Sequence, residues 1–311
     1  MSGFLPSPAA AAVIALLFGL VVGSFANVVI YRLPLGESIV FPASRCPRCL
    51  VAIRAWHNVP LISWSLLRGR CASCRESISF RYPAVEALHG LGFALIVLRF
   101  GFRPFTGLLL LFFFALVVLA FIDWDHQILP DVITLPGVLV GVMGAFLPGA
   151  LVDWREAALS AGFGYVTFFL VAEGYARLRG IEGLGQGDWK LAAMMGAFLG
   201  GQRLLLTVFL GSLSGLAYGL VQATRLSRRG ASVVLPQSAA AETDPGLEAA
   251  VEIVNEDPLA ESSPSDPPPT DEPSPIGKYR LPFGTFLAAS GILVLLFGDF
   301  IVGWYGAFFR Y

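Results

Sequence analysis

Long apolar segments dominate this sequence, and they constrain its fold more than any other feature. Of the 311 residues, 56% are hydrophobic and 14% are charged, whereas about a quarter of the residues in a soluble domain are charged. A helix needs about 20 apolar residues to cross the hydrocarbon core of a bilayer. The sequence therefore predicts an all-α polytopic membrane protein with about eight transmembrane helices. The expected spans are residues 9–31, 84–100, 105–122, 133–152, 157–176, 190–201, 204–223 and 283–306.

The distribution of basic residues predicts how these helices are oriented. The first basic residue is Arg32, so residues 1–31 lack the positive start of a cleavable signal peptide and are expected to form a helix whose N-terminus lies outside. Eight spans then place four connections in the cytoplasm. These connections and the start of the sixth span hold 16 of the 21 Lys and Arg residues, in agreement with the positive-inside rule. The net charge of −1 gives no indication of a nucleic-acid partner.

The connection before the last span has an unusual composition. Residues 230–276 contain nine prolines and ten acidic residues, and such a segment buries too little apolar surface to offset its ordering entropy. We expect it to be disordered. The predicted organisation is a first transmembrane helix (1–31), a cytoplasmic four-cysteine loop (32–83), a transmembrane core (84–224), an acidic, proline-rich cytoplasmic insertion (225–280) and a last transmembrane helix (281–311).

All four cysteines lie in the first cytoplasmic loop, as two Cys-x-x-Cys pairs. Cys46 and Cys49 are separated from Cys71 and Cys74 by 21 residues. Two such pairs suit tetrahedral zinc, because each pair of thiolates binds one side of the ion. The alternative is two disulfides, which the reducing cytoplasm disfavours. The sequence predicts a small zinc-ribbon-like loop with a structural metal, since four thiolates leave no coordination position for water.

Aspartates occur at the cytoplasmic ends of two predicted spans. Asp123 and Asp125 end the third span, and Asp188 begins the sixth within Gly185-Gln186-Gly187-Asp188-Trp189-Lys190. Carboxylates beside lipid are costly and often functional. Two that approach each other share one proton, which is the chemistry of aspartic proteases.

Other interpretations of these residues stay open from the chemistry alone. A lone aspartate after a membrane helix is commonly a solvated end or a helix cap, and a single Gly-x-Gly-Asp is a weak signal. Asp125 and Asp131 are equally plausible partners for Asp188, and His126 is a further candidate base. Gly185 and Gly187 would let a substrate backbone approach Asp188, and Lys190 would orient an anionic group or mark the membrane surface.

Several motifs resemble those of the bacterial prepilin peptidases, also called type IV leader peptidase and N-methyltransferase. They keep the order of that family over nearly the whole chain. The matching segments are Gly23-Ser24-Phe25-Ala26-Asn27-Val28-Val29, Arg32-Leu33-Pro34, both cysteine pairs, Asn58-Val59-Pro60, Ser63-Trp64, Arg81-Tyr82-Pro83-x-Val85-Glu86, the run from Asp123 to Asp131, the run from Gly185 to Lys190, and Leu281-Pro282-Phe283-Gly284.

The resemblance implies a function and a location. It implies that Asp123 and Asp188 are the catalytic pair of a membrane aspartic endopeptidase in the bacterial inner membrane, with its active site facing the cytoplasm. Such an enzyme cleaves the leaders of type IV prepilins or type II secretion pseudopilins and methylates the new N-terminus with S-adenosylmethionine. The alternatives are a membrane transporter and a catalytically inactive assembly factor. The sequence identifies neither the particular pilin nor the oligomeric state.

Overall fold

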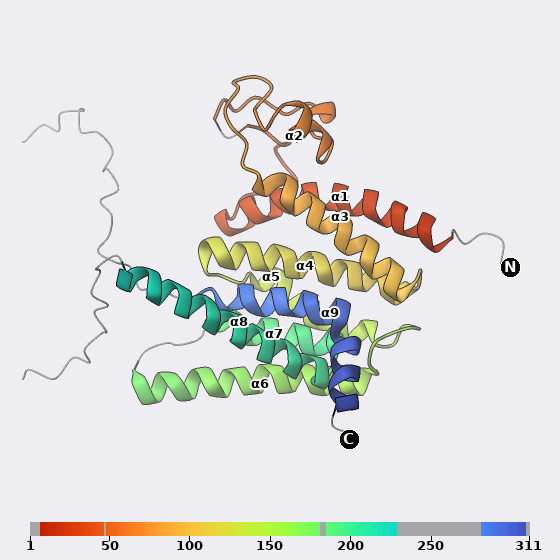
Figure 1. The fold of residues 1–311 in the computed structure, drawn as a ribbon, viewed down its shortest axis with the longest axis vertical. Coiled ribbons are helices and arrows are strands. Elements are labelled where there is room, and N and C mark those ends of the chain that lie inside the picture. The colour runs from red at the N-terminus through yellow and green to blue at the C-terminus, as the bar shows by residue number, and fades with distance from the viewer. Residues whose placement is uncertain (1–6, 47, 181–184, 229–280, 309–311) are drawn as a thin grey trace, which may run out of the picture. The chain divides into compact units, whose positions relative to one another are not determined.

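A computed structural model describes residues 7–46, 48–180, 185–228 and 281–308 of the chain (Figure 1), and the predicted insertion at 230–276 lies outside them. This part of the chain is helical, with two isolated β-bridges. Its helices are α1 Pro8–Arg32, α2 Ile62–Leu66, α3 Arg81–Phe100, α4 Pro104–His126, α5 Asp131–Gly144, α6 Trp154–Arg179, α7 Gln186–Leu199, α8 Gly201–Arg228 and α9 Phe283–Phe308, with 3₁₀ turns at Leu33–Leu35 and Ala55–His57.

Each of the eight expected spans coincides with a helix, but only six helices in the described part are long and apolar enough to cross a membrane. The exceptions are α5 and α7, of 14 residues each. At a rise of about 1.5 Å per residue, each is about 21 Å long, which is shorter than the bilayer core. The expected span 133–152 was too long because α5 ends at Gly144 and a turn through Pro148 and Gly149 follows.

One compact unit comprises residues 1–217 and 282–311. Within it, α1 packs on α3, and both contact α4. On its other sides α4 contacts α9 and α5, which in turn contact α7, and α7 packs against α6 (Figure 1). The second unit, Tyr218–Leu281, includes the end of α8, where Gln222 Nε2 donates a hydrogen bond to the Tyr218 hydroxyl. Among the six long helices α4 is the most buried, so it forms the centre of the first unit.

Small residues bring α1 and α3 unusually close together. A Cβ atom placed on Gly19 would lie 2.5 Å from the carbonyl oxygen of His89, and one on Gly23 would lie 2.7 Å from the Cα atom of Glu86. Glycines four residues apart are a common device for close packing of membrane helices. This contact fixes the start of α3 against the end of α1, where both helices join the cysteine loop.

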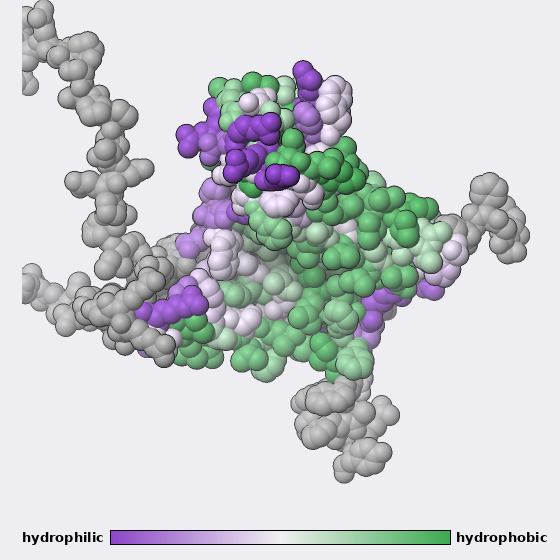
Figure 2. Space-filling view, turned by 45° about the horizontal axis from the view of Figure 1, so that its top comes forward, coloured by the Kyte–Doolittle hydropathy of each residue, from purple (hydrophilic) through white to green (hydrophobic). Residues whose placement is uncertain are grey.

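The surface of the helices is apolar, as a lipid-facing surface requires. Val13, Ile14 and Leu17 of α1 are each more than half exposed. Figure 2 shows a face on which apolar side chains cover most of the helical part, while hydrophilic side chains gather on the cysteine loop. On this face the helices therefore present the apolar surface that a bilayer would cover.

Candidate active site

Asp123 lies in the last turn of α4 and is 5% exposed. Its Oδ2 atom accepts a hydrogen bond from the backbone N–H of Thr285 at 2.6 Å, and the Thr285 Oγ1 atom lies 3.0 Å away. The same hydroxyl lies 2.9 Å from the carbonyl oxygen of Ala120. The first turn of α9 therefore orients a carboxylate that is 162 residues earlier in the chain.

Asp188 occupies the third position of α7 and is 6% exposed. Its Oδ2 atom accepts a hydrogen bond of 3.1 Å from the backbone N–H of Gly185, so it caps the helix as well as facing the site. Burial, reinforced by the negative charge of Asp123, raises the pKa of the Asp188 carboxyl to about 7. The two aspartates therefore lie near enough for the charge of Asp123 to act on Asp188.

Two glycines form close contacts beside this pair. A Cβ atom on Gly284 would lie 3.1 Å from the Asp123 carboxyl carbon, and one on Gly187 would lie 2.5 Å from the Cβ atom of Leu129. Gly187 was expected to leave room for a substrate, but in the structure it lets α7 pack against Leu129. Gly284, at the start of α9, is the glycine that approaches the Asp123 carboxylate.

Three other charged residues of the two motifs, Asp125, Asp131 and Lys190, form ion pairs outside the buried pair. The Oδ2 atom of Asp125 lies 2.6 Å from Nη1 of Arg81 on α3. The Arg81 guanidinium also lies over the ring of Phe121. Lys190 contacts both carboxylate oxygens of Asp131, at 2.6 and 2.7 Å. Of the three candidate partners for Asp188, Asp125 and Asp131 thus have cationic partners of their own, while Asp123 is the one whose charge acts on Asp188.

The cysteine loop contains two knuckles with the same backbone hydrogen bonds. In the first, the Cys46 N–H donates to Val51 O and the Leu50 N–H donates to Cys46 O. In the second, the Cys71 N–H donates to the carbonyl oxygen of Glu76, and the Arg75 N–H donates to the carbonyl oxygen of Cys71. The fifth residue of each knuckle, Leu50 or Arg75, has a positive φ. An antiparallel bridge closes each turn.

The four thiols fit a tetrahedral metal. Their Sγ atoms all lie within 4.8 Å of one another, and the Cys46 and Cys74 sulfurs are 3.8 Å apart. Four sulfurs bound to zinc at about 2.3 Å are themselves about 3.8 Å apart. Backbone N–H groups of Cys74 and Ser73 lower the pKa of the Cys71 thiol to about 7, which favours the thiolate that a metal requires. All four cysteines are free, so the structure does not form the alternative pair of disulfides.

Sequence reasoning predicted the aspartate pair but did not single out Thr285. Thr285 directly follows the motif Leu281-Pro282-Phe283-Gly284. Its position beside that motif was the only sequence feature that could have marked it as a candidate site residue. Its partner Asp123 could not be inferred without the fold. Trp64, Tyr82 and Glu86 were noted only as matching residues, and the structure places all three around one cavity.

Comparison with known proteins assigns the chain to a family. Residues 17–100 match the bacterial peptidase A24 N-terminal domain, and residues 110–220, which contain both aspartates, match the type IV leader peptidase family. The prepilin leader peptidase/N-methyltransferase of Neisseria gonorrhoeae is 42% identical over 67% of this chain and 81% of its own length. That of Myxococcus xanthus is 37% identical over 93% of this chain and 91% of its own. No solved structure matches the chain significantly. The chain therefore belongs to the type IV leader peptidase family.

Proposed function

We propose that this chain is a membrane aspartic endopeptidase that removes the leader of type IV prepilins or type II secretion pseudopilins and N-methylates the new N-terminus. The observation that carries the proposal is the buried, mutually interacting pair Asp123 and Asp188 in a member of this family. The relatives in Neisseria gonorrhoeae and Myxococcus xanthus are named for both activities, leader peptidase and N-methyltransferase.

In the proposed cleavage the two carboxylates hold one proton between them. The ionised carboxylate takes a proton from water, and the resulting nucleophile attacks the scissile carbonyl carbon. The protonated carboxyl polarises the carbonyl oxygen and later supplies a proton to the leaving amine. Thr285 and Gly185 hold the pair in place through the hydrogen bonds that they donate.

We further propose that the aspartates face the cytoplasm from a multi-pass inner-membrane protein. The six apolar helices and the family support the membrane location. The orientation is supported by the basic residues, which concentrate in the cysteine loop and in the connections at the same end as Asp123 and Asp188. The apolar helix of a substrate would then lie in the lipid beside the enzyme, with its leader in the cytoplasm.

Two cofactors accompany this proposal. Zinc bound by Cys46, Cys49, Cys71 and Cys74 would stabilise a loop too short to have a hydrophobic core. S-adenosylmethionine would supply the methyl group. Asp125 and Lys190 are proposed as supporting residues, since their ion pairs with Arg81 and Asp131 join α4 to α3 and α7 to α5 beside the pair.

The other function classes are less consistent with these observations. A transporter of the inverted-repeat type binds its substrate near the bilayer midplane, whereas Asp123 and Asp188 occupy the terminal turns of their helices. An inactive assembly factor would have no need of a buried carboxylate pair, which is costly to maintain. The comparisons favour neither alternative.

The direct test is mass spectrometry of a prepilin incubated with the purified protein and S-adenosylmethionine. We expect the mature chain to lose its leader and to carry one methyl group in place of a hydrogen of its N-terminal amine. Incubation without S-adenosylmethionine should give the cleaved, unmethylated product. An intact prepilin after prolonged incubation with folded enzyme would contradict the proposal.

A further inference from the structure

The short helix α2 lies beside the start of α3, one of the helices long and apolar enough to cross a membrane. The N–H of Leu61, directly before α2, donates a hydrogen bond of 2.8 Å to the Oε2 atom of Glu86. Glu86 follows Arg81, the first residue of α3, by about 7.5 Å along the helix axis at a rise of about 1.5 Å per residue. Figure 1 shows α2 alongside the starting end of α3 rather than beyond it. The cysteine loop is therefore held against the side of a membrane helix, at the level of the bilayer surface.

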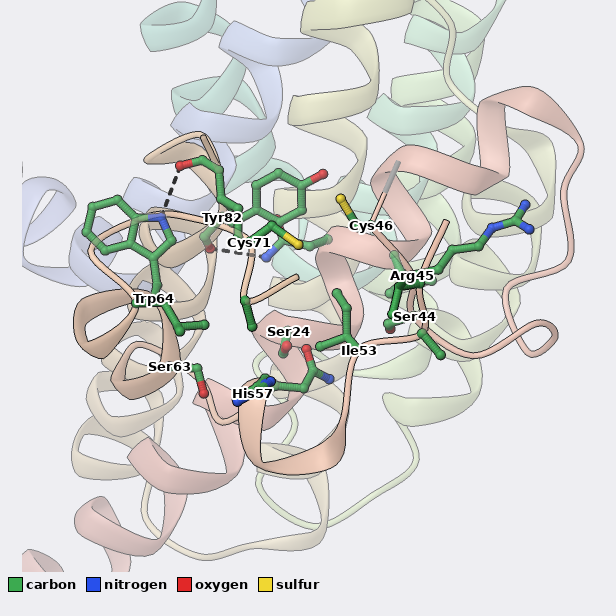
Figure 3. Close-up of a pocket in the computed structure, with 18 of the residues that line it drawn as sticks. Ser24, Ser44, Arg45, Cys46, Ile53, His57, Ser63, Trp64, Cys71 and Tyr82 are labelled. Atoms are coloured by element: carbon green, nitrogen blue, oxygen red, sulfur yellow. Dashed lines mark hydrogen bonds between the residues drawn. The ribbon is translucent and has the colours of Figure 1, made fainter. Parts of the chain in front are cut away.

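The two sides of α2 have different surroundings. Ser63 and Trp64 line a pocket between the loop and the ends of α1 and α3 (Figure 3), as does Leu67 directly after α2. Ile62 and Leu66 line no part of this pocket and are 58% and 78% exposed. Residues four positions apart lie on the same face of a helix. The side of α2 that faces away from the pocket is therefore apolar and exposed.

Phe80 adds a third exposed apolar side chain beside α2. Its ring meets the ring of Trp64 edge-on, with the centroids 5.7 Å apart, and the residue is 70% exposed. It directly precedes Arg81, where α3 begins. Leucine and phenylalanine side chains in this kind of position bury themselves at the boundary between lipid head groups and acyl chains. Exposure to water would leave the same side chains without apolar contacts.

Three arginines surround an open hollow directly after α2. The hollow is lined by Leu67, Arg68, Arg70 and Arg75. All three arginines are exposed, and none of them forms an ion pair within the part of the chain that the structure describes. A guanidinium group binds phosphate through paired N–H donors. The hollow therefore offers unpaired positive charge to a phosphate group, next to the apolar side of α2.

We propose that this side of the cysteine loop docks on anionic phospholipids around the helices, with its apolar side chains against the acyl chains and its arginines on the phosphate groups. The docking surface consists of Ile62, Leu66, Phe80, Arg68, Arg70 and Arg75. Apolar burial and attraction to anionic lipid together bind such a surface to a membrane. A soluble protein partner fits less well, because the bond from Leu61 to Glu86 keeps α2 at the level of the bilayer surface. The proposal needs only the membrane location of the chain, so it is independent of cleavage and methylation.

Hydrogen exchange of the full-length, zinc-loaded protein in lipid nanodiscs tests this docking. Nanodiscs of phosphatidylcholine alone are compared with nanodiscs that also contain phosphatidylglycerol. We expect the anionic lipid to slow exchange in peptides covering 61–70 by about fivefold or more, since a single arginine near an anionic surface contributes about that factor. High salt should reduce the difference, because it screens the charges. Peptides covering 145–153, a connection without basic residues, should exchange equally in both.

Substitutions separate the charged and apolar parts of the docking surface. The triple variant with all three arginines of the hollow replaced by glutamine should lose the lipid-dependent difference. Leu66→Ser should reduce it, and because this side chain is exposed its replacement should leave the loop folded. The matched control replaces Arg177 and Arg179 by glutamine, which removes basic residues from the last turn of α6, and it should keep the difference. Zinc content and the unfolding temperature check that each variant is folded.

Three results would overturn the proposal. Equal exchange of 61–70 in the two kinds of nanodisc at low salt would show that the surface does not bind anionic lipid and is left to a soluble partner. A folded triple variant that keeps the full difference would show that the arginines do not contact the phosphates. Inorganic phosphate is added to the phosphatidylcholine nanodiscs as a further arm. Protection of 61–70 by this ion to the same extent as by phosphatidylglycerol would assign the hollow to a soluble phosphate instead of a lipid.

Discussion

At the scale of single residues, the central feature is a carboxyl group whose pKa burial raises to about 7. Asp188 is buried at the start of α7 and faces Asp123, and both effects disfavour its ionised form. Asp188 therefore keeps its proton to a higher pH than an isolated carboxyl group does.

This shift predicts the alkaline limit of cleavage. A raised pKa means that the acid form is present below about pH 7 and is lost as pH rises through that value. Once both carboxylates are ionised, none can protonate the leaving group, so kcat/KM should fall above about pH 7. The measurement is the pH dependence of kcat/KM for prepilin cleavage. A kcat/KM that continues to rise well above that pH would contradict the assignment.

Thr285 provides a second prediction at this scale. Its hydroxyl lies 3.0 Å from the Asp123 carboxylate, and Thr285→Val removes this group while preserving the shape of the side chain. Loss of one hydrogen bond to a charged group costs about 1.5–3 kcal/mol, so we expect kcat to fall by about 10-fold or more.

Thr285→Ser is the matched control, because it keeps the hydroxyl and should retain most of the activity. The rates of both variants are compared in a single-substrate cleavage assay. Equal activity of the valine variant and the unmutated protein would show that the backbone N–H of Thr285 suffices to orient Asp123.

At the scale of structural elements, the cysteine loop is defined by two turns of the same design. Each knuckle places its fifth residue, Leu50 or Arg75, at a positive φ that non-glycine residues adopt at a cost of about 1–2 kcal/mol. Neither turn has a hydrophobic core to offset this cost, so metal binding is the expected source of stability.

We therefore expect about one zinc ion per chain in the purified protein. Cys46→Ser should lose the metal and destabilise the loop, because Cys46 is the most buried of the four ligands. Ser73→Ala changes a knuckle residue that has no thiol, so this variant should keep the zinc ion. Elemental analysis with thiol titration provides the measurement. Four free thiols without zinc, or two disulfides, would contradict the metal site.

The contact between α1 and α3 gives a prediction about packing. A Cβ atom on Gly19 would lie 2.5 Å from His89 O, and neither backbone can move without separating the helices. Gly19→Ala should therefore destabilise the protein by about 1–3 kcal/mol, as overpacking does. Gly162→Ala on α6 meets no atom within 4 Å and should be neutral or slightly stabilising. Thermal unfolding in detergent compares them, and equal unfolding temperatures would contradict the close packing.

At the scale of the whole molecule, the sequence predicted the features that depend on local composition. Apolar segments predicted the positions of all eight long or medium helices, and the cysteine spacing predicted that the four thiols lie together. The lengths of α5 and α7 were less predictable, because apolar residues continue beyond Gly144 into a turn. Contacts between distant segments could not be predicted from composition. Asp123 and Thr285 are separated by 162 residues, and the partners Lys190 and Asp131 by 59.

The central claim is that Asp123 and Asp188 together cleave the substrate. The most direct measurement compares prepilin cleavage by purified Asp123→Asn, Asp188→Asn and Asp125→Asn variants with matched zinc content. Asparagine keeps the size of the side chain and removes the shared proton, so both buried-site variants should lose activity by several orders of magnitude. Asp125→Asn, which loses only an ion pair with Arg81 at the edge of the site, should be milder. Substantial turnover by either buried-site variant, or an inactive Asp125→Asn beside an active Asp123→Asn, would contradict this account.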